Sequence, residues 1–143
     1  MHLESLRKVQ QQASALEAQE LRKLVGMQDL LQREQQQGQQ LLQHQQLYRQ
    51  QVPGAGQQVS AALLQQYQHF LLKLRQAIEQ QDARIQHFSS QCEKQREQWK
   101  QSHSRVQSLD FLIEREEKRL QALELKKEQR QLDEFNHRLK VRP

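Results

Sequence analysis

The stretch that decides the fold lies in the second half of the chain and repeats every seven residues. Residues 64–120, written one heptad at a time, read LQQYQHF-LLKLRQA-IEQQDAR-IQHFSSQ-CEKQREQ-WKQSHSR-VQSLDFL-IEREEKR-L. Every heptad opens on an apolar residue: Leu64, Leu71, Ile78, Ile85, Cys92, Trp99, Val106, Ile113 and Leu120. Such a repeat is typical of a helix that packs lengthwise against another helix, and these nine residues are its a positions.

The partner series of this heptad, at the d positions, is half polar. It consists of Tyr67, Leu74, Gln81, Phe88, Gln95, Ser102, Leu109, Glu116 and Leu123. A polar residue in a helix seam costs stability but restricts register and partner. After Leu123 the apolar residues change phase to Leu125, Leu132 and Leu139, with Phe135 beside them, which indicates a stutter or the start of a different contact surface.

The composition supports long helices and excludes several other classes of protein. The 143 residues include 33 glutamines, only four glycines and two prolines, and 35% are hydrophobic. This is too little turn-forming and apolar material for a compact enzyme with a thick core. The longest apolar run has four residues, so direct insertion into a membrane is not expected, and no signal segment follows Met1. A lone cysteine, Cys92, excludes a disulfide scaffold and is expected to be a small apolar core residue.

The first half carries a weaker version of the same pattern and ends at the one strong helix breaker. Apolar residues step by threes and fours through Leu6, Val9, Ala13, Leu16, Leu24, Met27 and Leu31, and resume at Leu41, Leu42, Leu47 and Tyr48. The breaker is Val52-Pro53-Gly54-Ala55-Gly56, and Ser60 is the expected N-cap of the next helix. Gly26 and Gly38 are expected to soften the first helix rather than to admit a close neighbour.

These signals predict an all-α protein, a long antiparallel two-helix coiled-coil hairpin forming a single domain over residues 1–143. The first helix is expected over about 3–51, the turn over 52–58 and a longer second helix over about 59–140. With the turn centred near residue 55, facing residue numbers would sum to about 110, which places Leu6 near Ser104. The part of the second helix after about Asp110 would then lack a partner within the chain, and its apolar residues would need another surface to meet them.

No catalytic, metal or cofactor site is indicated, and no enzymatic activity is expected. The six histidines do not pair at helical spacing, and Gly54-Ala55-Gly56 lacks the flanking residues of a phosphate loop. The net charge of +5 is spread along the chain rather than gathered in one basic block, so no nucleic-acid partner is expected. The dense charges of residues 114–119 fit either a solvated face or a surface matched to a charged partner.

Three short motifs resemble the FliJ family, the stalk proteins of the bacterial flagellar type III export apparatus. They are Tyr67-Gln-His-Phe70-Leu-Leu-Lys-Leu74-Arg-Gln-Ala77-Ile78, the tail Leu132-Asp133-Glu134-Phe135-Asn-His-Arg138 closing on Arg142-Pro143, and the step Leu47-Tyr48-Arg49 before the break. The length and the longer second helix are also similar, so the resemblance spans nearly the whole chain.

The resemblance implies a non-enzymatic stalk that works in the cytoplasm, peripherally attached to the membrane through the export apparatus. Members link a hexameric FliI-like export ATPase to the cytoplasmic domain of a FlhA-like export gate, and they assist export chaperones that deliver substrates during flagellum assembly. Carried over by position, the gate-facing residues would be Phe70, Leu74, Ala77 and Gln81, although the family can carry histidine at the last of these. The ring-facing residues would be Leu120, Leu123, Leu132, Asp133, Glu134, Phe135 and Arg138.

Two alternative functions share the helical architecture. One is the stalk of a virulence-type III secretion system, against which the Asp133-Glu134-Phe135 tail favours the flagellar branch. The other is a generic structural coiled-coil adaptor, including a parallel homodimer of long helices. An intramolecular antiparallel arrangement of the two helices would discriminate against the parallel homodimer.

Overall fold

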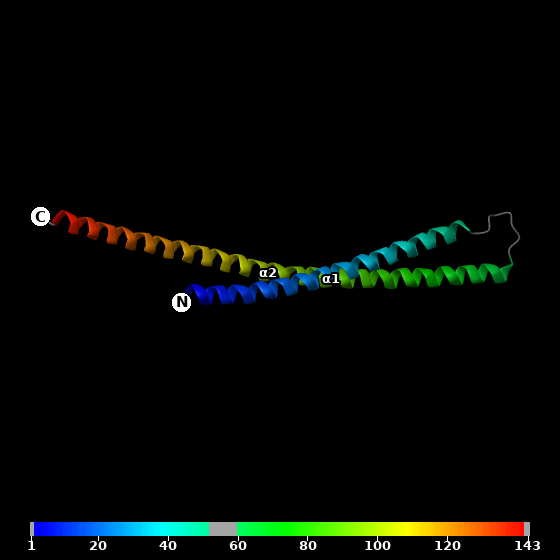
Figure 1. Ribbon diagram of the computed structural model, residues 1–143. Helices are drawn as coiled ribbons and strands as arrows, with labels where there is room; N and C mark the ends of the chain where they lie inside the picture. The colour runs from blue at the N-terminus through cyan, green and yellow to red at the C-terminus, as the bar shows by residue number, and fades with distance from the viewer. Residues whose placement is uncertain (1, 52–59, 142–143) are drawn as a thin grey trace. The chain divides into compact units, whose positions relative to one another are not determined.

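Two long helices make up the computed structural model, which describes residues 2–51 and 60–141. Helix α1 spans His2–Gln50 and helix α2 spans Ala61–Val141, so the second helix is much the longer, as predicted (Figure 1). Their ends lie within two residues of the predicted boundaries. The predicted turn, 52–58, falls outside the described residues.

Helix α2 begins at the N-cap that the sequence indicated. The Ser60 hydroxyl oxygen accepts a hydrogen bond from the Leu63 amide at 3.2 Å, and the Ser60 carbonyl accepts one from the Leu64 amide at 3.1 Å. The first N–H groups of a helix have no partner within the helix, so a serine side chain at this position satisfies one of them. Ser60 therefore fixes the start of α2.

The two helices form an intramolecular antiparallel pair, and their contacts divide into two compact units. One unit joins the residues up to Gln19 with those from Trp99 onward, and the other comprises Glu20–Gln98. In each unit α1 and α2 lie side by side and run in opposite directions (Figure 1). Interhelical bonds occur in both units, between Arg7 and Glu117 in the first and between Glu34 and Gln81 in the second. This arrangement is the predicted hairpin and not a parallel homodimer.

The predicted heptad of α2 is the face that α1 covers. Cys92 and Val106 are buried at a positions, and Leu74, Gln81 and Gln95 are buried at d positions. Most other members of the two series are half-buried, whereas Leu64, Leu120 and Leu123 are exposed. The sequence therefore identified the seam of α2 correctly, including its polar members.

The seam of α1 is partly different from the predicted one. Its covered residues are Leu3, Leu6, Gln10, Ala13, Glu17, Glu20, Leu24, Met27, Leu31, Glu34, Gly38, Leu41, Gln45 and Tyr48, a strict alternation of three- and four-residue steps. Four apolar residues assigned to the stripe are instead exposed, namely Val9, Leu16, Leu42 and Leu47. The prediction followed apolar residues, whereas the seam also buries polar ones.

The predicted register was wrong by several residues. Gln10 donates a hydrogen bond to Asp110, and Arg7 pairs with Glu117 at 3.0 Å, so facing numbers in this unit sum to 120 or more rather than to 110. The midpoint of a break does not fix which seam residues face each other, because side-chain packing and hydrogen bonding across the seam decide it. Consequently α1 covers α2 well past Asp110.

Candidate docking surfaces

Three aromatic side chains gather where the end of α1 meets the start of α2. The rings of Tyr48 and Tyr67 stack with centroids 4.8 Å apart, and the Phe70 ring tilts against Tyr48 at 4.3 Å. The Tyr67 hydroxyl donates a hydrogen bond to the Tyr48 carbonyl at 3.1 Å. Phe70 remains 46% exposed, so this cluster holds an aromatic ring that is positioned by packing and still reachable from solvent.

The four predicted gate-facing residues differ in their exposure to solvent. Phe70 is exposed and Ala77 is half-buried, whereas Leu74 is buried in the seam. Gln81 is only 6% exposed, because its side chain is directed at Glu34 on α1. Of these four residues, Phe70 therefore has the most exposed side chain, whereas Leu74 and Gln81 lie in the seam.

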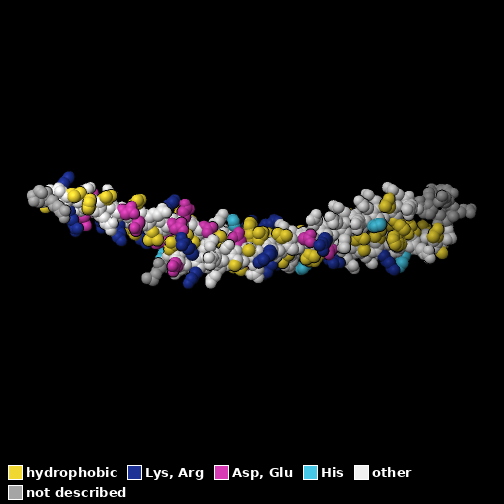
Figure 2. Space-filling view, in the orientation of Figure 1, with side chains coloured by type: hydrophobic (Ala, Val, Ile, Leu, Met, Phe, Trp, Pro, Cys, Tyr) yellow, Lys and Arg dark blue, Asp and Glu magenta, His cyan; other side chains and the backbone are white. Residues whose placement is uncertain are grey.

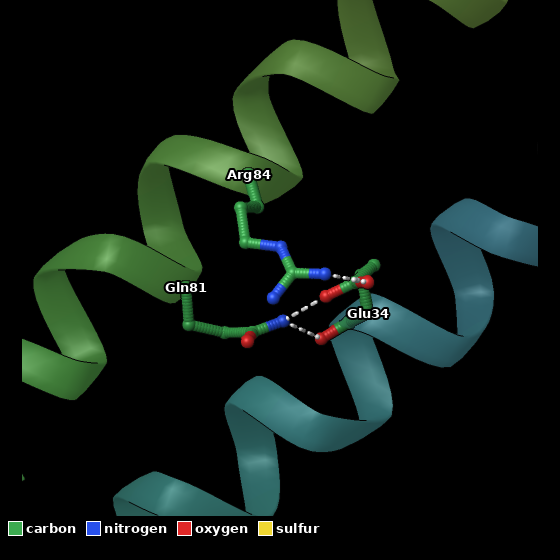
Figure 3. A network of polar contacts seen from close by, with 3 residues as sticks. All are labelled: Glu34, Gln81 and Arg84. Carbon is green, nitrogen blue, oxygen red and sulfur yellow. Dashed lines mark hydrogen bonds and ion pairs between the residues drawn. The ribbon is translucent and has the colours of Figure 1, made fainter.

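Gln81 belongs to a polar network across the seam that is centred on Glu34 (Figure 3). Its Nε2 nitrogen donates to the Glu34 carbonyl oxygen at 2.9 Å and also to the Glu34 carboxylate. Arg84 forms an ion pair with the other carboxylate oxygen at 3.1 Å. The carboxylate is thus satisfied from two sides, which is the condition for burying a charged group at low cost. The sequence had shown Gln81 as a polar seam residue but had not shown its partner on α1.

The opposite end of α2 carries the predicted ring-facing residues, and the structure leaves all of them exposed. Leu120 is 41% exposed, Leu123 is 50% and Leu132 is 61%, and Phe135 resembles Leu132 in exposure. Asp133, Glu134 and Arg138 are exposed as well. Figure 2 shows apolar side chains lying between charged ones toward this end of α2. Every described residue from 118 onward is exposed, so α1 buries none of this segment.

The exposed apolar series of this segment lies on the face of α2 opposite the α1 seam. Leu125, Leu132 and Leu139 are at f positions, about 140° around the helix from the a positions. Phe111 belongs to the same series and is 64% exposed, although α1 still lies against that part of α2. Helix α2 continues without interruption to Val141 through this change of phase, so these leucines form an exposed apolar series on a face that α1 does not cover.

The charges between Glu114 and Arg119 pair largely within α2. Lys118 bonds to Glu114 at 3.2 Å, and Arg119 holds Glu116 through two hydrogen bonds. The bond from Arg119 is the main cause that lowers the pKa of the Glu116 carboxyl below its ordinary value, and the same bond raises the pKa of Arg119. Glu117 instead reaches Arg7 on α1. Most of these charges are therefore paired within α2 or with α1.

Two further seam residues behave as the sequence indicated. Cys92 is 3% exposed, as expected of a small apolar core residue. Trp99 is half-buried and stacks on His103, whose Nδ1 lies 2.6 Å from the Glu17 carboxylate.

Among the described residues, no group of histidine, cysteine and acidic side chains could hold a metal ion. Within the same residues, neither helix contains an apolar segment long enough to cross a membrane.

Comparison with known proteins identifies a family. The model of the family described as flagellar FliJ protein matches the chain over residues 1–143. No curated protein and no solved structure matches.

Proposed function

Because the chain belongs to the FliJ family and is a non-catalytic component of the flagellar export apparatus, we propose that it is the stalk that links the export ATPase to the export gate. In this role it works in the cytoplasm, attached to the membrane only through the apparatus. Its partners are a hexameric FliI-like ATPase, the cytoplasmic domain of a FlhA-like gate and export chaperones. The observation that carries the proposal is the uncovered C-terminal segment of α2, which leaves apolar residues available to a partner.

The ring-facing role is supported by the shape and chemistry of this segment. This single helix exposes the apolar side chains of Leu120, Leu123, Leu132 and Phe135 to water. A partner protein that buried them would gain hydrophobic binding energy. Asp133, Glu134 and Arg138 add both signs of charge beside it. Contacts of this kind could favour one conformation of an ATPase subunit over another, which is how a rod without chemistry would influence nucleotide turnover.

The gate-facing role is supported by the aromatic cluster at the start of α2. The Phe70 ring is positioned by its contact with Tyr48 and is still accessible to solvent. Exposed aromatic side chains frequently supply a large share of binding energy. Leu74, Ala77 and Gln81 continue the same helix face inward toward the seam. In this proposal Phe70 makes the direct contact, and the other three set its position.

The ring-facing role is tested with purified FliI-like ATPase from the same export apparatus. The chain should raise the rate of ATP hydrolysis, and Leu132→Ser with Phe135→Ser should abolish the increase. Leu30→Ser with Leu42→Ser is the matched control, because these leucines are also about half exposed but lie on α1. Loss of stimulation in both variants, or in neither, contradicts a specific role of the C-terminal segment.

The gate-facing role is tested by the affinity of the chain for the FlhA-like cytoplasmic domain. Phe70→Ala should weaken binding at least tenfold. Phe111→Ala is the control, since Phe111 is the more exposed of the two rings and lies in the other unit. Equal affinity of wild type and Phe70→Ala would refute the direct contact.

A further inference from the structure

Three interhelical hydrogen bonds of the same kind recur at a fixed interval within the unit Glu20–Gln98. The Tyr67 hydroxyl donates to the carbonyl oxygen of Tyr48, Gln81 Nε2 donates to that of Glu34, and Gln95 Nε2 donates to that of Glu20. We call these three residue pairs the polar rungs. In each rung a d residue of α2 reaches the main chain of a seam residue of α1.

The spacing of the rungs is identical on both helices. The α2 members lie two heptads apart, at positions 67, 81 and 95, and the α1 members lie two heptads apart as well, at positions 48, 34 and 20. Rungs therefore occupy every second position of the d series. The intervening α2 positions hold Leu74 and Phe88, and those of α1 hold Leu41 and Met27. Polar and apolar residues thus alternate in step on the two helices.

The two glutamine rungs also contain a nearly enclosed carboxylate. The Glu34 and Glu20 side chains are 14% and 13% exposed, and each receives a second hydrogen bond from the same glutamine nitrogen. Gln81 and Gln95 are each 6% exposed. A helix carbonyl has a second lone pair that can accept such a bond anywhere along α1, so the carbonyl alone selects no register. The carboxylate does select a register, because burying it in the seam is costly unless a hydrogen-bond donor faces it.

We propose that the polar rungs determine the register in which α1 and α2 pair. The a series of α2 is apolar in every heptad, so a slip by one heptad would keep most apolar contacts. The same slip would set the Glu34 carboxylate against Phe88 and would set Gln81 against Leu41, and both polar groups would lose their partners. A slip by two heptads in the same direction would set Gln95 against Glu34 and so restore one rung, but it would set the Glu20 carboxylate against Leu109. The register in turn decides how many residues of α2 extend beyond the first residue of α1, and this conclusion does not depend on the proposed function.

The register is measured by the distance between two spin labels. The labels go on Gln28→Cys in α1 and Gln66→Cys in α2, both exposed, in a chain whose buried thiol is removed by Cys92→Ala. A slip by one heptad changes their separation by about 10 Å, since a helix rises about 1.5 Å per residue. The unaltered seam should give one narrow distance.

The decisive variant moves the rungs by one heptad along α2 without changing composition. It exchanges neighbouring d residues: Tyr67→Leu with Leu74→Tyr, Gln81→Phe with Phe88→Gln, and Gln95→Ser with Ser102→Gln. The glutamines then face Glu34 and Glu20 only after a one-heptad slip. The label distance should consequently lengthen by about 10 Å, the rise of one heptad of helix. An unchanged distance in this variant would overturn the proposal.

A second variant keeps the test decisive if the exchanged seam does not fold. Glu20→Leu, Glu34→Leu, Gln81→Leu and Gln95→Leu make both glutamine rungs apolar and should preserve the helical circular-dichroism signal. Without these rungs the label distances should spread over two or more values separated by about 10 Å. A single distance equal to that of the unaltered seam would show that other residues determine the register.

Discussion

A Cβ atom added at Gly38 would lie 3.1 Å from the Cδ1 atom of Ile85 across the seam. The two helices therefore approach closely at this glycine, which corrects the expectation that Gly38 only softens α1. Gly26 differs, because an added Cβ would meet nothing within 4 Å. One glycine of α1 thus serves the packing of the helices, and the other lies on an open face.

The two glycines are expected to respond differently to alanine. Gly26→Ala should raise the free energy of unfolding by up to about 1 kcal/mol, because alanine is the better helix former and the site is open. Gly38→Ala should raise the free energy of unfolding by less, because the Ile85 side chain must shift to admit the new methyl group. In an Ile85→Val background, which removes Cδ1, the gain at residue 38 should recover. Equal effects of the two alanines in urea unfolding would contradict the close approach.

Ser60 is expected to hold the first turn of α2. Ser60→Ala should lower the local stability by about 1 kcal/mol, because the Leu63 amide loses its acceptor. Faster hydrogen exchange of the amides of residues 61–65 would report this loss. Ser60→Asp retains an acceptor and should exchange at nearly the rate of the unaltered chain, and equal acceleration in both variants would rule out the cap.

Substitutions of Leu74 and Phe70 are expected to differ in their effect on the stability of the helix pair. Leu74→Ala should lower the free energy of unfolding by about 2–3 kcal/mol, because it leaves a cavity in the seam. Phe70→Ala removes a ring that is 46% exposed and should cost clearly less. Thermal unfolding followed by circular dichroism measures both. Binding assays with the export gate should consequently use Phe70→Ala, since loss of binding in Leu74→Ala could arise from unfolding.

The Cys92 thiol is expected to report the opening of the helix pair. At 3% exposure it should react with a maleimide far more slowly than a cysteine introduced at exposed Gln66 in a Cys92→Ala chain. In concentrated urea the two rates should converge, because unfolding exposes both thiols. Comparable rates without denaturant would mean that α1 does not cover this part of α2.

Glu116 is expected to titrate at a lower pH than an ordinary glutamate. The hydrogen bond from Arg119 lowers its pKa, so Arg119→Gln should raise that pKa toward the ordinary value. The stabilisation from this pair is present above the ordinary pKa and is lost as the pH falls through the lowered one. Carboxyl ¹³C chemical shifts measure the titration. Lys118→Gln, which removes the partner of Glu114 instead, should leave Glu116 nearly unchanged.

Much of the proposed docking chemistry could be assigned from the sequence, but its accessibility could not. The motif around Phe70 and the tail around Phe135 carried the family resemblance, and the family match supports it. The sequence did not separate exposed Phe70 from buried Leu74 and Gln81, because all three fall on one broad helix face. Their exposures depend on where α1 lies, which is a property of the pair.

The sequence by itself determined that this protein is two long helices separated by one break, and it located the seam of α2. A seven-residue repeat and an N-cap are local signals, so they can be read along one segment of chain. Only the tertiary structure decided the register of the pair, the acidic partners Glu20 and Glu34 in the seam of α1, and the exposure of the tail. Two repeats of the same period can align in several ways, and which alignment gives the Glu20 and Glu34 carboxylates their donors depends on both helices at once.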